Sequence, residues 1–240
     1  MPTLWKRTRS IDYLAQYSPY FDYDAAVLRG LGDGQRAGCA WDVSGNNKHC
    51  LRVAAADVPR VKLAAQNGLP AYQFTAAGQR LFTPVNARVP QDVTFFIVCK
   101  YHATTGYLFS WFSAPNFVGF AIGSSYAQLD YRAPNGQELS SGAFTAATST
   151  SAYAIYCCTM NSTTKTGTIY KNGASIGTST NAAMNWTGFT STSSFRMNAN
   201  LNDNLSAISS IGKLVIFPTL LTAQNIADIF AYLNSIWACY

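Results

Sequence analysis

The 240-residue sequence predicts an all-β protein, namely an antiparallel β-sandwich of the jelly-roll type with one α-helix at the C-terminal end. Three observations support this fold class. Short apolar segments rich in β-branched and aromatic residues recur along the chain, about ten residues apart. Gly, Asn, Pro and Ser separate these segments, as expected for turns between strands. A helical spacing of apolar residues is convincing in one segment, which is the last.

Taken in order, the first strand is predicted at 21–27, before a glycine-rich stretch at 29–34 and a turn at 42–47. A second turn at 67–70 leads into a strand at 71–74. The composition of the next segments is that of buried strands, and they lie at 93–99, 107–112, 117–122 and 127–131.

The last third of the chain carries the clearest local signals. Asn172-Gly173 supplies the two residues with positive φ that a tight hairpin turn requires, so 168–177 is predicted as a hairpin. A strand at 213–217 ends before Pro218, and Thr222 is a typical helix N-cap. The helix that follows has one apolar face, made of Ile226, Ile229, Phe230, Leu233 and Ile236.

The composition excludes some classes of protein. Hydrophobic residues make up 48% of the chain and charged residues 12%, which excludes a disordered chain. No apolar stretch approaches the roughly 18 residues of a membrane-spanning helix, so no membrane insertion is expected. The net charge is +6, but the basic residues form no recognition motif, so we expect no nucleic-acid partner.

No linker divides the chain, and we expect one sandwich domain over residues 21–240. Residues 1–20 fit neither a strand nor a helix and are interpreted as an N-terminal arm. Its basic run could meet an acidic surface or a phosphate backbone, or stay solvated. We favour a solvated or protein-docking arm, in which the docking residues are Leu4, Trp5, Lys6, Arg7 and Arg9.

The six cysteines are interpreted as reduced thiols. A chain of this length does not need disulfides, and Cys157 and Cys158 are neighbours in a strand, where they point to opposite faces. The N-terminus has no apolar segment of the length typical of a secretory signal. We therefore expect synthesis and assembly inside a reducing cell.

Five motifs follow one another along the chain: Phe21-Asp-Tyr-Asp-Ala-Ala26, Trp41-Asp-Val-Ser-Gly-Asn-Asn-Lys-His49, Asn67-Gly-Leu-Pro-Ala-Tyr-Gln-Phe74, Thr168-Ile-Tyr-Lys-Asn-Gly173 and the closing strand and helix from Lys213 to Trp237. In this order they resemble the concanavalin A-like lectin/glucanase superfamily, in its laminin-G-like branch, over about residues 21 to 238. Such domains are common in bacterial surface proteins and bacteriophage virion proteins. The resemblance implies a sandwich fold but no single activity, because this fold hosts lectins, hydrolases and structural modules.

The candidates for catalysis are few. Hydrolases of the superfamily use paired carboxylates, whereas the one glutamate here, Glu138, reads as an exposed turn residue. Asp22 and Asp24 would share one face of a strand, which makes a carboxylate pair geometrically feasible. The histidines His49 and His102 are not accompanied by a nucleophile elbow. We therefore predict a protein that is not an enzyme.

No metal site or cofactor is predicted. Cys39, His49 and Cys50 match no zinc spacing, and the residues of the turn after Trp41 are interpreted as loop formers. Laminin-G-like domains often bind calcium at a loop edge. Calcium therefore stays an open alternative, with Asp33, Asp130 and Asp203 as the loop acids.

Glycan binding requires an aromatic face with hydrogen-bonding neighbours. The glycan-binding residues we predict are Trp186, Asn185, Tyr131, Asp130 and Arg132. Tyr126 is a further candidate beside Asp130, Tyr131 and Arg132. Another candidate region consists of Trp111, Phe112 and Asn116. The alternative at each aromatic position is burial in the core, which we consider for Trp41, Trp111 and Trp237.

The scarcity of catalytic residues predicts a non-enzymatic protein, and the resemblance implies a bacteriophage virion structural protein, namely a capsid decoration or tail-fibre component. The resemblance implies assembly in the host cytoplasm, a location in the virion and other virion proteins as partners. A homo-oligomer and a host cell-surface polysaccharide as ligand are further expectations. The alternative is a glycan-degrading hydrolase of the same superfamily, which the scarcity of carboxylates disfavours.

Overall fold

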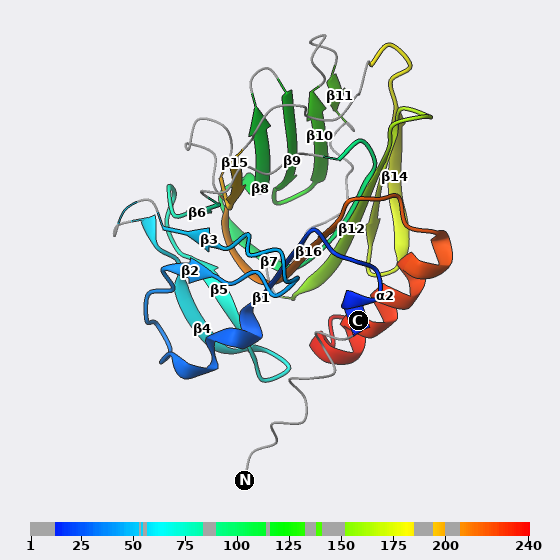
Figure 1. Cartoon of the computed structure of the whole chain (residues 1–240). Coiled ribbons are helices and arrows are strands. Elements are labelled where there is room, and N and C mark those ends of the chain that lie inside the picture. The colour runs from blue at the N-terminus through cyan, green and yellow to red at the C-terminus, as the bar shows by residue number, and fades with distance from the viewer. Residues whose placement is uncertain are drawn as a thin grey trace.

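The computed structural model describes residues 13–52, 54, 57–83, 90–113, 116–132, 138–140, 152–184, 194–199 and 207–240. Within these residues the chain is an all-β sandwich of two antiparallel sheets with one C-terminal α-helix, as the sequence predicts (Figure 1). Apolar residues alternate along the strands, and one face of each sheet packs against the other sheet.

The first sheet has the strand order β14-β13-β12-β7-β16-β5-β4, and β1 pairs with the half of β16 that β5 leaves uncovered. Its central strands β7 and β16 are long and almost wholly buried. The strands are β1 Phe21–Asp24, β4 Arg60–Gln66, β5 Leu69–Phe74, β7 Val93–Ala103, β12 Ala154–Asn161, β13 Thr166–Lys171, β14 Ala174–Thr180 and β16 Ile208–Phe217.

The second sheet has the strand order β11-β10-β9-β8-β15-β6-β3-β2. Its edge next to β2 consists of very short strands, whereas β8, β9 and β10 form a longer antiparallel ribbon with one register shift between Tyr107 and Phe109. The strands are β2 Cys39–Ala40, β3 Cys50–Leu51, β6 Leu81–Phe82, β8 Gly106–Ser113, β9 Asn116–Ile122, β10 Ala127–Arg132, β11 Glu138–Ser140 and β15 Ser194–Met197.

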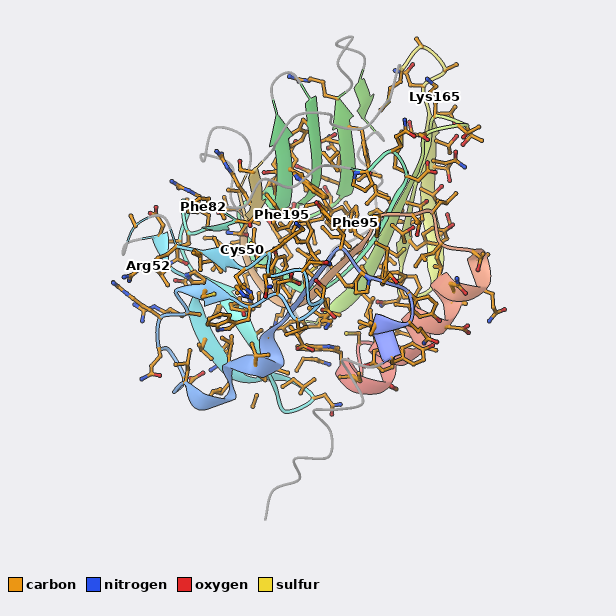
Figure 2. All side chains as sticks on the ribbon, viewed as in Figure 1. Cys50, Arg52, Phe82, Phe95, Lys165 and Phe195 are labelled. Carbon is orange, nitrogen blue, oxygen red and sulfur yellow. The ribbon has the colours of Figure 1, made fainter. Side chains whose placement is uncertain are left out.

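Aromatic rings fill the space between the sheets. Phe95 of the first sheet meets Phe109 of the second edge to face, with 4.6 Å between the ring centroids. Phe195 packs against Phe21 and Trp111 at 5.0 and 6.0 Å. Figure 2 shows Phe95 and Phe195 near the middle of the molecule. Ring pairs of this kind bury large areas and favour one packing arrangement.

Helix α2, Ala223–Trp237, covers the outer face of the first sheet (Figure 1). The predicted N-cap is confirmed, because the Thr222 hydroxyl accepts a hydrogen bond from the Asn225 amide at 3.1 Å. The predicted apolar face is confirmed at Ile226, Ile229, Phe230 and Leu233, which are buried together with Trp237. Trp237 lies directly over Gly212. No helix in the described part of the chain is long and apolar enough to span a bilayer.

The hairpin between β13 and β14 is also confirmed. Asn172 and Gly173 have φ of 50° and 87°, which is the left-handed conformation that the prediction required. The Asn172 side chain accepts a hydrogen bond from the Ile155 amide at 2.9 Å, so the turn is tied to the neighbouring strand.

Three local predictions need correction. The first strand ends at Asp24, because its side chain caps the 3-10 helix η1, Ala25–Gly30, by accepting a hydrogen bond from the Ala26 amide. Strand β4 was not predicted, since its sequence does not alternate regularly and Ala64 has φ of 48°. Glu138 begins a short edge strand rather than lying in a turn.

The last eight residues of the predicted arm pack onto the sandwich. Leu14 is fully buried in the cluster beneath α2, and the Tyr13 ring stacks on Tyr232 of the helix at 4.3 Å. Figure 1 shows this N-terminal turn beside α2. Residues 13–20 are therefore part of the domain, whereas the predicted docking residues Leu4, Trp5, Lys6, Arg7 and Arg9 lie outside the described residues.

Candidate binding surface

One row of directly paired residues crosses the outer face of the second sheet. Residues opposite each other in an antiparallel ladder project to the same side. Their neighbours Leu129, Phe195 and Leu81 belong to the core, so the row itself faces away from the core. In order from β10 to β2 the row consists of Asp130, Gly119, Ser110, Arg196, Phe82, Leu51 and Cys39.

The predicted glycan-binding residues on β10 do not share a face. Asp130 and Arg132 project outward, and Arg132 is exposed. Tyr131 points inward and is 1% exposed, so its ring belongs to the core and cannot stack on a ligand. This corrects the prediction for Tyr131, and the cause is the two-residue period of the strand. Asn185 and Trp186 lie outside the described residues.

Asp130 already has protein partners. Its carboxylate accepts hydrogen bonds from the Tyr107 hydroxyl at 2.6 Å and from the Gln128 amide at 2.7 Å. Burial and the nearby carboxylate raise the pKa of Tyr107 well above its usual value. Gly119 lies under the rings of Tyr107 and Phe117, where an added Cβ would come within 3 Å of both. Side chains of the protein therefore fill this end of the face.

The other end of the face presents an open aromatic ring. Trp41 directly follows β2 and is 52% exposed, whereas Trp111 and Trp237 are buried as considered from the sequence. The His49 ring packs edge to face against Trp41, with 4.7 Å between the centroids. Leu51 extends the same outward face and is 39% exposed. Among the described tryptophans, Trp41 is the exposed one.

The sequence contains a signal for this exposure, although Trp41 is absent from the predicted glycan-binding residues. In a hairpin of β2 and β3, Cys39, Trp41, His49 and Leu51 fall on one face by alternation. Ala40 lies on the opposite face and is fully buried, as small apolar residues at a sandwich edge often are. The alternation therefore places Trp41 outside once Ala40 is placed inside.

The loop between Trp41 and His49 is held by Asp42. Its carboxylate accepts hydrogen bonds from the amides of Asp22 and Ser44 at 3.0 Å and of Lys48 at 2.9 Å. The Asp42 amide donates to Nδ1 of His49 at 3.0 Å, which fixes the orientation of the imidazole ring. Trp41 and its partner ring therefore sit on a rigid support, and the sequence-based interpretation of Asp42 as a loop former is confirmed.

Asn46 anchors the same loop to the rest of the domain. Its side-chain amide donates to the carbonyl oxygens of Pro19 and Tyr20 at 3.0 and 3.2 Å. The ammonium group of Lys48 lies 4.8 Å from the centre of the Tyr20 ring. These contacts tie the loop to the segment that enters β1.

Asp22 and Asp24, considered from the sequence as a feasible carboxylate pair, do share one face, but both side chains bind the buried Lys213. The Lys213 ammonium contacts Asp22 and lies 3.1 Å from Asp24. Burial raises the pKa of Asp22 to about 6, although Lys213 lowers it. Burial alone would lower the pKa of Lys213, and the two carboxylates reverse this and raise it. The pair is an internal ionic network without access to a substrate.

A serine and a histidine lie within hydrogen-bond distance on the first sheet. His102 Nε2 is 2.8 Å from the Ser210 hydroxyl, a separation suited to activating a nucleophile. Ser210 is 1% exposed, so a substrate cannot reach its oxygen. Burial and Lys100 lower the pKa of His102, which favours the neutral form of the ring. The contact between His102 and Ser210 therefore contributes to the packing of β7 against β16.

The thiols and acids considered for metal binding have other roles. All six cysteines are free, and Cys157 and Cys158 point to opposite faces of β12, as predicted. Asp33 accepts hydrogen bonds from Lys62 and from the Leu63 amide. Asp203, the third acid considered for calcium, lies outside the described residues. Within the described part of the chain no group of three or more metal-binding side chains comes together.

The sequence matches no family model and no curated protein. Solved structures do match. The binding domain of Paraclostridial mosquitocidal protein 1 superposes with a TM-score of 0.65 at 14% identity, over 92% of this chain and 53% of that one. The receptor-binding domain of botulinum neurotoxin D gives a TM-score of 0.64 at 12% identity, over 91% of this chain and 54% of that one. The chain has the fold of one part of these domains.

A third match comes from botulinum neurotoxin type C, whose entry into cells depends on interaction with two ganglioside molecules. It has a TM-score of 0.63 at 13% identity and covers 93% of this chain and 53% of that one. The present chain thus spans about half the length of the structures it matches. At these identities the likeness establishes the β-sandwich fold, and function has to be argued from the site.

Proposed function

We propose that this protein is a non-enzymatic binding module that holds a cell-surface glycan on the β2–β3 edge of the second sheet. The observation that carries the proposal is the open ring of Trp41 beside His49. A pyranose presents a face of C–H groups, which packs favourably on an exposed indole, and its hydroxyls need hydrogen-bonding side chains at the rim. His49 supplies such a group next to Trp41.

The rigidity of the support strengthens the proposal. Because Nδ1 of His49 accepts a hydrogen bond from the Asp42 amide, a neutral ring carries its proton on Nε2, which is then free to donate to a ligand oxygen. Binding to a site that is already ordered loses little conformational entropy. The ganglioside dependence of the type C neurotoxin supports a carbohydrate as the ligand class.

We further propose that the module belongs to a bacteriophage virion, as a capsid decoration or tail-fibre component, and assembles as a homo-oligomer. The resemblance in the motifs at 21–26, 41–49 and 67–74 supports this context, as does the predicted docking arm. Because Leu14 is buried in the domain, we confine the proposed docking arm to residues 1–12. Deleting residues 1–12 should leave a folded domain that no longer joins particles, and normal incorporation would contradict the docking role.

Binding and hydrolysis are separated in one experiment. The purified protein is incubated with a glycan array and with host-envelope polysaccharide, and both retention and released reducing ends are measured. We expect retention without release. Release of reducing ends would support the hydrolase alternative, and the absence of both signals would contradict a glycan-binding function.

A further inference from the structure

Three exposed arginines gather at the edge of the sandwich beside Trp41. Arg36 and Arg60 lie directly opposite each other in an antiparallel bridge. Flanking hydrogen bonds fix this pairing, from the Ala37 amide to the Pro59 carbonyl and from the Val61 amide to the Gln35 carbonyl, both at 2.8 Å. Like charges placed opposite each other destabilise a ladder, so the pairing has an energetic cost.

Arg52 joins this pair from the end of strand β3. Its amide donates to the Gly38 carbonyl at 3.0 Å, two residues from Arg36. Its side chain lies over Gly38, since a Cβ at that position would come 3.6 Å from Arg52 Cδ. Figure 2 shows Arg52 extending from the periphery of the molecule, away from the core. We call Arg36, Arg52 and Arg60 the arginine rim.

The acids of this region do not neutralise the arginine rim. Residues 29–83 contain seven basic residues and three acids. Asp33 pairs with Lys62 at 3.0 Å, and Asp57 pairs with Arg80 at 3.5 Å. The third acid, Asp42, is buried and holds the loop by its amide contacts. Within the described residues no carboxylate forms an ion pair with the rim.

The segment 36–41 joins the arginine rim to Trp41, because it runs from the bridge with β4 of the first sheet into β2 of the second. An extended segment from Arg36 to Trp41 spans about 17 Å, which an oligosaccharide of a few residues can cover. Guanidinium groups bind carboxylate and sulfate groups through paired N–H donors, and they are effective where several are held close together. The edge thus combines a stacking surface with a set of oxyanion donors.

We propose that the ligand of this edge is an acidic glycan, whose carboxylate or sulfate groups bind the arginine rim while one sugar ring stacks on Trp41. This inference rests on the proposed glycan-binding function and names its ligand class. A ligand anion offsets the repulsion among the three arginines, so binding should weaken as ionic strength rises.

The test compares four probes by calorimetric titration: tetragalacturonate, a sulfated heparin tetrasaccharide, neutral cellotetraose and a single-stranded DNA oligonucleotide. We expect at least one acidic tetrasaccharide to bind ten-fold or more tightly than cellotetraose, and the preferred acid group distinguishes carboxylate from sulfate. Equal binding of acidic and neutral sugars would overturn the acidic class and leave glycan binding intact. Binding of none of the sugars would contradict the proposed function as well. Tighter binding of DNA than of every sugar would assign the edge to nucleic acid and overturn the inference.

Two sets of variants test whether the arginine rim causes the preference for the acidic tetrasaccharide. The triple variant Arg36→Gln, Arg52→Gln, Arg60→Gln should lose the preference for the acidic tetrasaccharide and keep its affinity for the neutral one. The matched control Lys100→Gln, Lys165→Gln, Lys171→Gln removes the same charge from β7, from the turn before β13 and from β13, and should retain the preference. An equal loss of this preference in the triple variant and in the control would show a general charge effect and overturn the inference.

Replacing the three arginines by lysine keeps the charge and guards against unfolding. This variant should still bind the acidic tetrasaccharide several-fold more weakly, because the paired N–H donors are lost.

Discussion

The two sheets of the sandwich use tryptophan on their outer faces in opposite ways. On the first sheet, Trp237 of α2 closes over Gly212 and is 2% exposed. On the second sheet, Trp41 stands beside His49 and is 52% exposed. The same side chain is core where a helix covers the sheet and is exposed where it stands at an edge, and there we propose that it binds a ligand. Substitutions on the covered face should therefore reduce stability, and substitutions at the β2–β3 edge should reduce binding.

The largest loss of stability is expected from Lys213, which projects from β16 on the first sheet. Lys213→Met leaves Asp22 and Asp24 buried without their cation, and breaking a buried ion pair in this way costs about 3–5 kcal/mol. Urea unfolding measures the change, with Lys100→Met as a control on the neighbouring strand. A loss below about 1 kcal/mol in Lys213→Met would show that the network is dispensable.

The same ionic network predicts that the free energy of unfolding depends on pH. The pKa of Asp22 in the folded protein, about 6, lies above its ordinary value, so the folded state binds the proton more tightly than the unfolded state. The stability from this group is complete below about pH 4 and is lost as the pH rises through 6. An upper limit for the loss is about 3 kcal/mol. The free energy of unfolding of Asp22→Asn should lack this component between pH 4 and 7, and an unchanged profile would contradict the assignment.

A smaller loss is expected at Gly212. An added methyl group would lie within 3 Å of the Trp237 ring, so Gly212→Ala forces the helix or the strand to shift, at about 1–3 kcal/mol. Gly30→Ala is the control, because an added Cβ there meets nothing within 4 Å. Thermal unfolding of the two variants should separate them. Equal melting temperatures would show that α2 does not press on the sheet at this point.

Much of the fold could be predicted because its signals are local. The hairpin at Asn172-Gly173 and the N-cap at Thr222 depend on backbone conformations that few residues adopt. Strand β4 escaped prediction because tertiary pairing with β5, not its own pattern, makes it a strand. The packing of Leu14 beneath α2 is a long-range contact that no local pattern encodes.

The candidate site was harder to predict, because it depends on which face of a strand meets the core. Alternation within the predicted strand 127–131 already separates Tyr131 from Asp130, and it argues against placing both in one glycan-binding set. Trp41 resembles a core residue by type, and its exposure follows from its position at the sheet edge. The gathering of Arg36, Arg52 and Arg60 joins two sheet edges, so the spacing of these residues in the sequence does not indicate it.

The smallest effect on stability and the most informative effect on binding are expected at Trp41. Removing an exposed side chain changes the free energy of unfolding by about 0.5 kcal/mol or less. The control is Tyr240→Ala, which removes an aromatic ring of similar exposure, 54%, from the C-terminal end. Both variants should therefore fold like the parent.

Calorimetric titration of the best-binding glycan into the parent protein, Trp41→Ala and Tyr240→Ala tests the central claim most directly. We predict that Trp41→Ala loses at least ten-fold in affinity, whereas Tyr240→Ala binds like the parent. Unchanged affinity in a folded Trp41→Ala variant would show that the β2–β3 edge is not the glycan site.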